Sequence, residues 1–365
     1  MGQSDVIIVG AGFAGAATAF YLSQKTDLEI VLVEREETFG VHASGRNAAM
    51  LRQAVPDEKV GQWIQETLTF IKTPPVHWEV PNLFRQTGSM LTGTYQQLLS
   101  LKSQLEKLNV PGEIYAPSEF PKGTPEDLIQ FLKSSSYQAL LHTPSDGVVD
   151  IHSFLGQLLK DAKSRGVKVF YNSEVKKINW RENHWSVQTS GEKFSAKILI
   201  NAAGAWINQI GGQAGQKAPE MIPFRRHLYF SESEAPVQEH WPLVWNVDQE
   251  IYFRPETGGI LLSPGDEDPQ EPGLPQMNPN ILELLDKKLK NVFPSLQDLS
   301  ITRGWACLRT KTATGRAYVT QDAENKNFFW VGALGGHGVG ASMGVGKSIS
   351  GEVRQHFKAF LGNGL

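Results

Sequence analysis

The sequence has little cysteine, no strong excess of either charge and no long apolar run, and each shortage excludes a class of protein. The single cysteine in 365 residues, Cys307, excludes an internal disulfide framework and favours a reducing compartment. The 35 Lys and Arg nearly balance the 38 Asp and Glu, so the net charge of −3 gives no electrostatic case for nucleic acid. No apolar run reaches the ~20 residues that a membrane helix needs. We therefore expect a cytoplasmic protein with no metal site and no transmembrane segment; peripheral contact with the inner face of the membrane stays open.

What the sequence does have is a glycine-rich turn near its start, between an apolar run and an Ala-rich stretch typical of a helix. The turn reads Gly10-Ala11-Gly12-Phe13-Ala14-Gly15. In this pattern Gly10 permits a tight turn, Gly12 lets a pyrophosphate approach the backbone, and Gly15 lets helix and strand pack closely. The phosphates would lie at the helix N-terminus, and Glu34, after the next apolar run, suits the ribose hydroxyls. The pattern predicts a dinucleotide-binding domain.

The length of the chain predicts two domains, because 365 residues are too many for one simple core. A helix expected over 152–165 and a strand over 167–171 suggest that the chain returns to the nucleotide domain after leaving it. The acidic, proline-rich run 266–279 predicts a loop. We assign residues 1–75, 140–215 and 296–365 to the first domain, and 76–139 and 216–295 to a substrate-binding domain.

Three glycine-rich segments, 10–15, 202–204 and 335–340, each follow a strand-like run and bear on the choice of cofactor. A nicotinamide enzyme needs one such segment, whereas an extended FAD has to be held at its pyrophosphate and at its isoalloxazine ring. Backbone N–H groups of 335–340, ahead of a helix, would face the flavin edge where negative charge gathers on reduction. FAD is therefore favoured. The run Gly346-Lys347-Ser348 resembles the end of a P-loop, but Ala341 stands where that motif requires glycine. We therefore reject the interpretation as a nucleoside triphosphatase.

Further motifs extend the pattern along nearly the whole chain. They are Gly10–Gly15, Glu34-Arg35, His42–Ala49, Asp146-Gly147, Asn201–Trp206, Trp305–Arg309 and Gly335–Gly338. Together they resemble the D-amino acid oxidase-like FAD-dependent oxidoreductases, which include glycine oxidase, sarcosine oxidase and D-amino acid dehydrogenases. Within this superfamily the chain is most similar to bacterial D-arginine dehydrogenase and glycine oxidase.

The resemblance implies an α/β fold, with a Rossmann-type FAD-binding domain and an inserted α+β substrate domain of mixed sheet, as in glycine oxidase. It implies non-covalent FAD; the alternative is a covalent link to Cys307, which matches the cysteine that holds flavin in sarcosine oxidases. The implied cofactor-binding residues are Gly10, Gly12, Phe13, Ala14, Gly15, Glu34, Arg35, Ser44, Gly45, Arg46, Asn47, Ala48, Ala49, Val175, Ala203, Gly204, Trp206, Gly335, Gly336, His337, Gly338 and Val339.

For the substrate, the resemblance implies that Arg309 binds a carboxylate, for which a guanidinium fork is well shaped. Tyr252 matches a tyrosine that adds a hydroxyl to the same carboxylate, and of the neighbours Arg225 and Arg226 we choose Arg226 as the one facing the site. His337 is interpreted as a flavin neighbour and not as a base. Two substitutions make a cationic substrate doubtful: Gly88 replaces the acid of D-arginine dehydrogenase, and Met50, which suits an aliphatic side chain, replaces a polar residue.

The predicted function is oxidative deamination of a D-amino acid or glycine-like amine to the imine, then to the 2-oxo acid and ammonia, by hydride transfer to flavin N5. Leu261 matches the lysine that promotes reaction with oxygen in sarcosine oxidases. This favours a dehydrogenase, but oxygen, a quinone and a carrier all stay open as acceptors. One alternative is a 2-hydroxy acid dehydrogenase, which needs a histidine base. Another is a non-catalytic flavin-binding subunit of a larger dehydrogenase.

Overall fold

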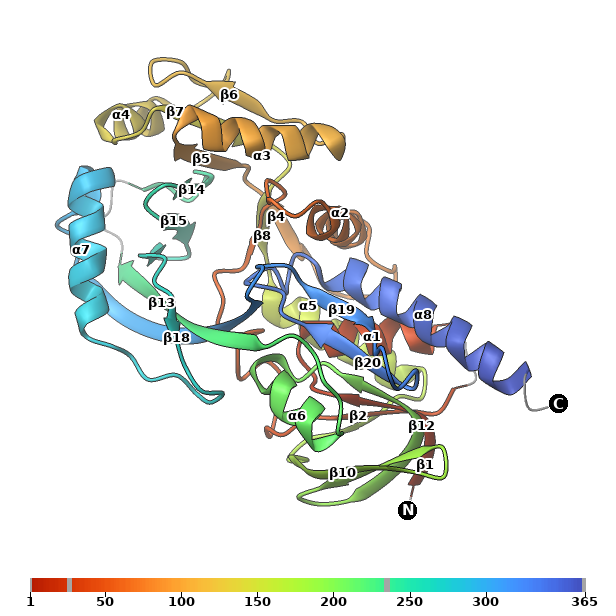
Figure 1. The fold of residues 1–365 in the computed structure, drawn as a ribbon. Helices are drawn as coiled ribbons and strands as arrows, with labels where there is room; N and C mark the ends of the chain where they lie inside the picture. Colours follow the sequence, from red (N-terminus) through yellow and green to blue (C-terminus); the bar gives the residue numbers. More distant parts are fainter. Residues whose placement is uncertain (1, 25–27, 233–236, 363–365) are drawn as a thin grey trace.

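The computed structural model describes residues 2–24, 28–232 and 237–362, and it contains two large sheets, each built from distant parts of the chain (Figure 1). The first has eight strands in the order β10-β11-β12-β1-β2-β9, with β20 beside β12 and β19 beside β20. The pairs β12–β1, β1–β2, β2–β9 and β12–β20 are parallel. The strands are β1 (Gly2–Val9), β2 (Ile30–Val33), β9 (Lys168–Phe170), β10 (Val175–Arg181), β11 (His184–Thr189), β12 (Lys193–Asn201), β19 (Tyr318–Gln321) and β20 (Phe328–Gly332).

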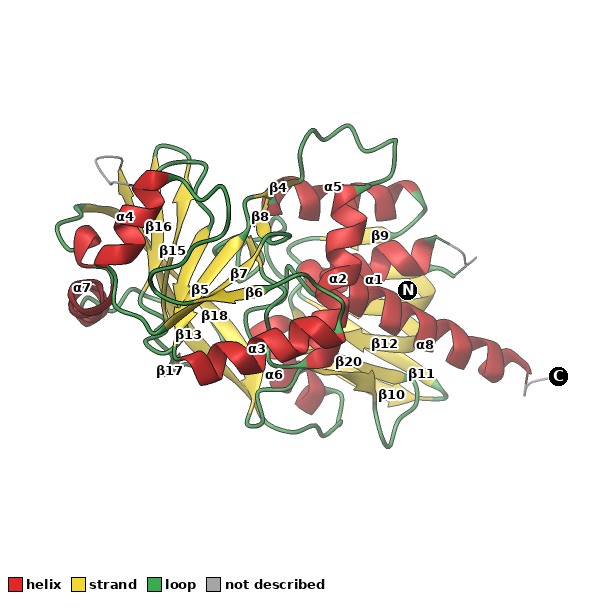
Figure 2. Ribbon diagram, turned by 90° about the horizontal axis from the view of Figure 1, so that it is seen from above, coloured by secondary structure: helices red, strands yellow, loops and turns green. Residues whose placement is uncertain are grey.

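The parallel strands of this sheet are apolar without alternation because both faces are covered. In β1, Val6 and Ile8 belong to one buried cluster, whereas Ile7 and Val9 belong to another on the opposite face. Helices cover the first of these faces, as Figure 2 shows for α1 and α8. The helices with members in this first cluster are α1 (Phe13–Ser23), α2 (Glu58–Lys72), α5 (Ile151–Ser164) and α8 (Ser342–Gly362), while α6 (Ile207–Gln213) lies on the second.

The second sheet is mixed and has nine strands, in the order β17-β13-β16-β15-β14-β5-β7-β6, with β18 beside β13. Only the β14–β5 pair is parallel among these pairings of the described chain. Helices α4 and α7 lie at the outer side of this sheet (Figure 2). The elements are β5 (Ser89–Gly93), β6 (Glu113–Tyr115), β7 (Ala139–Thr143), β13 (Met221–Glu232), β14 (Leu243–Asn246), β15 (Ile251–Glu256), β16 (Gly259–Ser263), β17 (Asp268–Pro269), β18 (Ile301–Thr312), α3 (Tyr95–Lys107), α4 (Glu126–Ser134) and α7 (Asn280–Val292).

The third sheet is small and has three strands. Its order is β3-β8-β4, and the remaining short elements are single turns of 3-10 helix. These elements are β3 (Met50–Leu51), β4 (Phe84–Gln86), β8 (Gly147–Val149), η1 (Gly204–Trp206) and η2 (Pro294–Leu296). Among the described helices none is long and apolar enough to cross a membrane.

The structure departs from the sequence-based expectations at two places in the second half of the chain. Residues 301–312, assigned from sequence to the FAD-binding domain, form β18 and pair with β13 of the second sheet, from Met221 opposite Thr312 to Ser231 opposite Ile301. This pairing joins residues far apart in the sequence, so local patterns do not reveal it. Within the predicted loop 266–279, Asp268 and Pro269 form the short strand β17. The return of the chain to the first sheet through α5 and β9 agrees with expectation.

Candidate functional site

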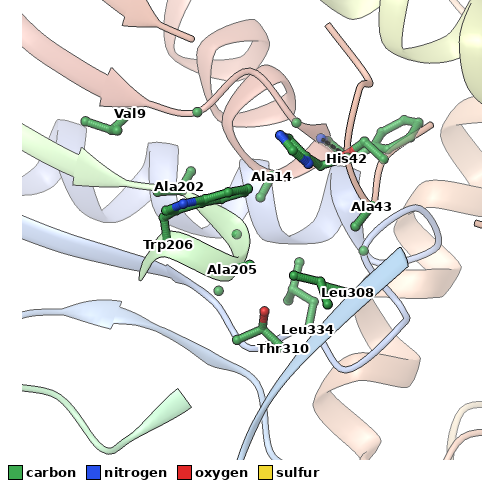
Figure 3. Close-up of a pocket in the computed structure, with 18 of the residues that line it drawn as sticks. Val9, Ala14, His42, Ala43, Ala202, Ala205, Trp206, Leu308, Thr310 and Leu334 are labelled. Atoms are coloured by element: carbon green, nitrogen blue, oxygen red, sulfur yellow. Dashed lines mark hydrogen bonds between the residues drawn. The ribbon is translucent and has the colours of Figure 1, made fainter. Parts of the chain in front are cut away.

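A long pocket follows the carboxyl ends of the parallel strands of the first sheet, where ligands of open α/β sheets bind (Figure 3). It is lined by the residues that end β1, β2, β12 and β20, by the loop after Gly40 and by part of β18. Figure 3 shows Trp206 and His42 on one side of the pocket, opposite Leu308, Thr310 and Leu334. The pocket therefore lies where the first sheet meets β18 of the second.

The glycines of the first turn have no room for a side chain. Gly10 has φ +102, and a Cβ on it would lie 2.5 Å from the Ala202 carbonyl oxygen. A Cβ on Gly15 would lie 1.9 Å from the carbonyl oxygen of Gly10, and one on Gly12 would lie 2.9 Å from Ser44 Oγ. The tight turn predicted for Gly10 and the close helix packing predicted for Gly15 are thus present. Since Gly12 borders the pocket at the N-cap of α1, the cradle fits a pyrophosphate.

One end of the pocket has the groups expected to meet an adenosine. Glu34 follows β2, and its carboxylate accepts hydrogen bonds from the Ala11 N–H at 2.8 Å and the Glu36 N–H at 3.1 Å. Val175 and Arg35 line the same pocket. The Arg35 guanidinium lies 4.5 Å from the centre of the Trp206 ring. The predicted adenosine region is therefore bordered by the Glu34 carboxylate, the Arg35 guanidinium and the apolar Val175.

The loop from Gly40 to Ala49 is held in shape by its own polar groups. Asn47 accepts a hydrogen bond from the Ala49 N–H at 2.7 Å and donates to the carbonyl oxygens of Ala43 and Ser44. Arg46 lines the pocket, and its Nη1 donates to the Ala306 carbonyl of β18 at 3.3 Å. The loop thus spans the two sheets.

Most residues predicted to bind the cofactor border this pocket, but some do not. Gly15, Gly45, Ala48, Ala49 and His337 lie outside its lining, and so do the predicted substrate residues Tyr252, Arg226 and Met50. Sequence reasoning missed His42, whose ring lies 4.6 Å from that of Trp206 and whose Nε2 lies 2.8 Å from Glu36. Its place at the start of the His42–Ala49 motif was a usable signal.

The two predicted carboxylate-binding residues meet beside the pocket, which Arg309 lines and Tyr252 does not. Arg309 Nη2 donates to Tyr252 Oη at 3.0 Å. A Cβ on Gly336, which has φ +94, would lie 3.1 to 3.2 Å from Arg309 Cδ, Nε and Nη1. Arg309 therefore lies against the glycine turn that follows β20. A cation and a hydroxyl side by side can bind a carboxylate next to a ligand held by that turn.

Arg226 lies on the same face of the sheet as Arg309. Because Arg226 is opposite Cys307 and Phe224 is opposite Arg309, the two arginines are diagonal neighbours on β13 and β18. Arg226 is 2% exposed, and its Nη2 lies 2.6 Å from Glu267. Its Nε and Nη1 have no hydrogen-bond partner within the part of the chain that the structure describes.

His337 is a neutral side chain close to the arginines. Burial, and then the charges of Arg52 and Arg309, lower the pKa of His337 to about 3. Met50, on β3, packs against the buried cluster that contains Tyr252 and Cys307. Cys307 itself borders the pocket and is 2% exposed, and burial raises the pKa of its thiol.

Arg52 is a residue of this region that the sequence did not single out. Its guanidinium lies 4.5 Å from the centre of the Trp245 ring, and that ring lies 4.6 Å from the ring of Tyr252. Its Nη1 donates to the Ala54 carbonyl. The position of Arg52 directly after Met50 and Leu51 was the available signal, but only the fold reveals its neighbours. Within the described ranges no group of three or more His, Cys, Asp and Glu could hold a metal ion.

Comparison with known proteins agrees with this geometry. The family model described as DAO, FAD dependent oxidoreductase, matches residues 5–351. Among curated proteins, the chain is 24% identical to the mitochondrial pyruvate dehydrogenase phosphatase regulatory subunit of Mus musculus, over 95% of this chain and 41% of that protein. It is 23% identical to L-2-hydroxyglutarate dehydrogenase of Indibacter alkaliphilus, over 63% of this chain and 58% of that protein. The matched regions thus span about two fifths to three fifths of the length of these relatives.

Solved structures share the fold over nearly their whole length. The L-proline dehydrogenase of P. horikoshii has a TM-score of 0.82 at 21% identity, over 95% of this chain and 92% of that one. The glycine oxidase of Geobacillus kaustophilus has a TM-score of 0.81 at 18% identity, over 97% and 95%. The predicted superfamily and the mixed α/β fold are thereby confirmed. The chain belongs to the FAD dependent oxidoreductase family.

Proposed function

We propose that the protein is an FAD-dependent amino acid dehydrogenase or oxidase. It oxidises the α-carbon–nitrogen bond of a D-amino acid or glycine-like amine to the imine, and water then releases the 2-oxo acid and ammonia. The observation that carries this proposal is the contact of Arg309 with Tyr252 and with the glycine turn at Gly336. A bound flavin would supply the hydride acceptor.

In this proposal the protein contributes binding and orientation. The α1 N-terminus and Glu34 bind the pyrophosphate and ribose, while Arg309 and Tyr252 fix the substrate carboxylate. Positioning of this kind lowers a barrier by about 7 to 11 kcal/mol at best. The positive charge of Arg52, Arg226 and Arg309 also disfavours an ammonium group nearby, so the bound amine is held neutral, as loss of hydride requires.

A 2-hydroxy acid is the alternative substrate, and the similarity to L-2-hydroxyglutarate dehydrogenase is the observation that favours it. That reaction needs a base to take the hydroxyl proton. His337 is a poor base, since its pKa is lowered to about 3 by burial and by Arg52 and Arg309. His227 is occupied: its Nδ1 lies 2.6 Å from Asp266, and its Nε2 accepts a hydrogen bond from the Asn278 N–H. The lack of a suitable histidine base in these contacts supports an amine, and not a 2-hydroxy acid, as the substrate.

A non-catalytic flavin-binding subunit is the alternative from another class, and the chain is similar to a regulatory subunit. A scaffold needs no carboxylate-binding pair, so Arg309 and Tyr252 weigh against it. For the electron acceptor we propose a quinone or carrier in place of oxygen. Leu261, which is 1% exposed in the core, puts no positive charge at the position of the sarcosine oxidase lysine.

The test is an anaerobic titration of the purified flavoprotein with D- and L-amino acids, glycine, sarcosine and 2-hydroxy acids, followed by the flavin absorbance. We expect bleaching by D-amino acids or glycine. Bleaching by hydroxy acids alone would move the protein to the alternative reaction. No bleaching by any compound would contradict both reactions and favour the subunit.

A further inference from the structure

A stack of side chains connects Arg52 to Arg309. Arg52 lies over Trp245, and Trp245 lies against Tyr252, with 4.5 Å and 4.6 Å between the groups. Tyr252 Oη then accepts the hydrogen bond from Arg309. Because Trp245 and Tyr252 are directly opposite on β14 and β15, both rings are on one face of the sheet. The two guanidinium groups thus lie at the two ends of one row of side chains.

Neither end of this row has a carboxylate in salt-bridge contact; the charges of Asp146 and Glu250 act on Arg52, and that of Glu267 on Arg309, only from a distance. Among the described residues no carboxylate lies within 4.0 Å of Arg52 or Arg309. Both charges act on the same third group, because they together lower the pKa of His337. Two cations therefore face one small region with no carboxylate in contact with either of them, and a partly buried cation without a close partner is unfavourable.

Two acids of the neighbourhood, Asp146 and Glu267, are already occupied, and a third, Glu250, acts on Arg52 and Arg226 without forming an ion pair with either. Asp146 is fully buried and accepts hydrogen bonds from Ser89 Oγ at 2.6 Å and from the Gln53 N–H and Nε2 at 3.0 Å each. Burial raises its pKa to about 6. Glu267 is shared between Arg226, at 2.6 Å, and Lys311. Arg226 nevertheless keeps two buried nitrogens without a partner. A third arginine thus has hydrogen-bond donors that no acceptor among the described residues satisfies.

A single substrate carboxylate, bound by Arg309 and Tyr252, leaves Arg52 without a carboxylate in contact. We propose that the amino acid oxidised by this protein carries a second carboxylate on its side chain, and that Arg52 binds it. This inference rests on the proposed function and narrows it to acidic amino acids. Arg52 is then a specificity-determining residue that selects the substrate side chain and does not contact the reacting atoms.

The experiment compares acidic amino acids with their uncharged isosteres in the anaerobic titration. D-glutamate is paired with D-glutamine, and D-aspartate with D-asparagine. A hydrogen bond between charged groups predicts half-bleaching by the acid at a concentration roughly 10- to 100-fold lower than by the amide. A second readout needs no turnover: glutarate should perturb the flavin spectrum at lower concentration than butyrate.

The variant Arg52→Met keeps a long side chain over Trp245 and removes the charge. It should bind flavin normally and lose the preference for acid over amide, while Arg52→Lys keeps part of it. Arg303→Met is the matched control, since Arg303 also lies over an aromatic ring, 4.3 Å from Phe230, but is exposed on β18. This control should keep the full preference.

The outcomes separate this inference from the proposed function. If D-glutamine bleaches the flavin as readily as D-glutamate, the acidic substrate is wrong and the amine reaction stands. If no amino acid bleaches it, both fail. A preference for D-glutamate that persists in Arg52→Met would overturn the role of Arg52. Misfolding of that variant would leave the decision to the wild-type comparison of the acid–amide pairs and of glutarate with butyrate.

Discussion

The proposed cofactor pocket and the arginine-rich region beside it are built in opposite ways. The pocket is shaped by backbone: Gly10, Gly12 and Gly336 line it, and a Cβ on any of them would press against a neighbouring residue. The region around Arg309 is shaped by long side chains that come from β13, β15, β18 and the segment after β3. A backbone cradle fits one invariant ligand and tolerates no added atom, whereas side chains on a sheet can be exchanged without changing the fold. We therefore expect substitutions in the first region to affect cofactor binding and folding, and substitutions in the second region to affect only substrate binding.

The largest effect is expected from Gly15→Ala, which tests the backbone side of this comparison. The added methyl would lie 1.9 Å from the Gly10 carbonyl oxygen, and neither backbone segment can yield without opening the turn. We expect a loss of about 3 kcal/mol in the free energy of unfolding and loss of the yellow colour. Denaturant unfolding and the ratio of protein to flavin absorbance measure both. Gly212→Ala on α6, with nothing within 4 Å, is the control and should behave as wild type.

The next effect is that of Arg309→Ala, which tests the side-chain region. Removing a guanidinium that holds a carboxylate costs about 2 to 5 kcal/mol, so KM should rise roughly 30-fold or more. Bound FAD should stay at its wild-type level. Steady-state kinetics and the flavin content of the purified variant decide the matter. A colourless Arg309→Ala protein with otherwise normal folding would mean that this arginine belongs to the cofactor site.

Tyr252→Phe should have a smaller effect, because it removes one hydroxyl and keeps the ring between Trp245 and the core. The lost hydrogen bond is worth about 1 to 1.5 kcal/mol, so KM should rise roughly 5- to 12-fold. The midpoint of thermal unfolding should change little. A fall in kcat with unchanged KM would instead place the hydroxyl at the reacting carbon.

The smallest effect on activity is expected from His337→Asn. With a pKa lowered from 6.5 to about 3 by burial and by two arginines, His337 is neutral throughout the working range, so the pH profile of kcat/KM between pH 5 and 8 should stay the same. Stability should respond instead. Because the folded pKa is the lower one, the unfolded state takes up the proton first, and stability is lost as pH falls from about 6.5 towards 3. The variant should lose less stability over this range than wild type does.

How much of this was predictable from sequence depends on the range of the contacts. The glycine turn, its helix and Glu34 lie within one short stretch, so their spacing alone indicated the cradle. Arg309 and Tyr252 were predicted through the family motifs around them and not through any pattern of charge. Arg52 was missed because its proposed role depends on its contact with Trp245. The sequence does not show that the residue after β3 lies against a ring on β14. The place of β18 in the second sheet was missed for the same reason.

One hydrogen bond connects the two large sheets and bears on local unfolding. The N–H of Gly335, in the turn after β20, donates to the carbonyl oxygen of Thr310 on β18 at 3.0 Å, and the side chain of Arg309 lies against the next residue, Gly336 (Figure 1 shows β18 and β20). This bond links the first sheet to the second beside the proposed cofactor and substrate sites. Neither half can loosen without disturbing the other, so a ligand bound at one site should slow hydrogen exchange in the strands of the other.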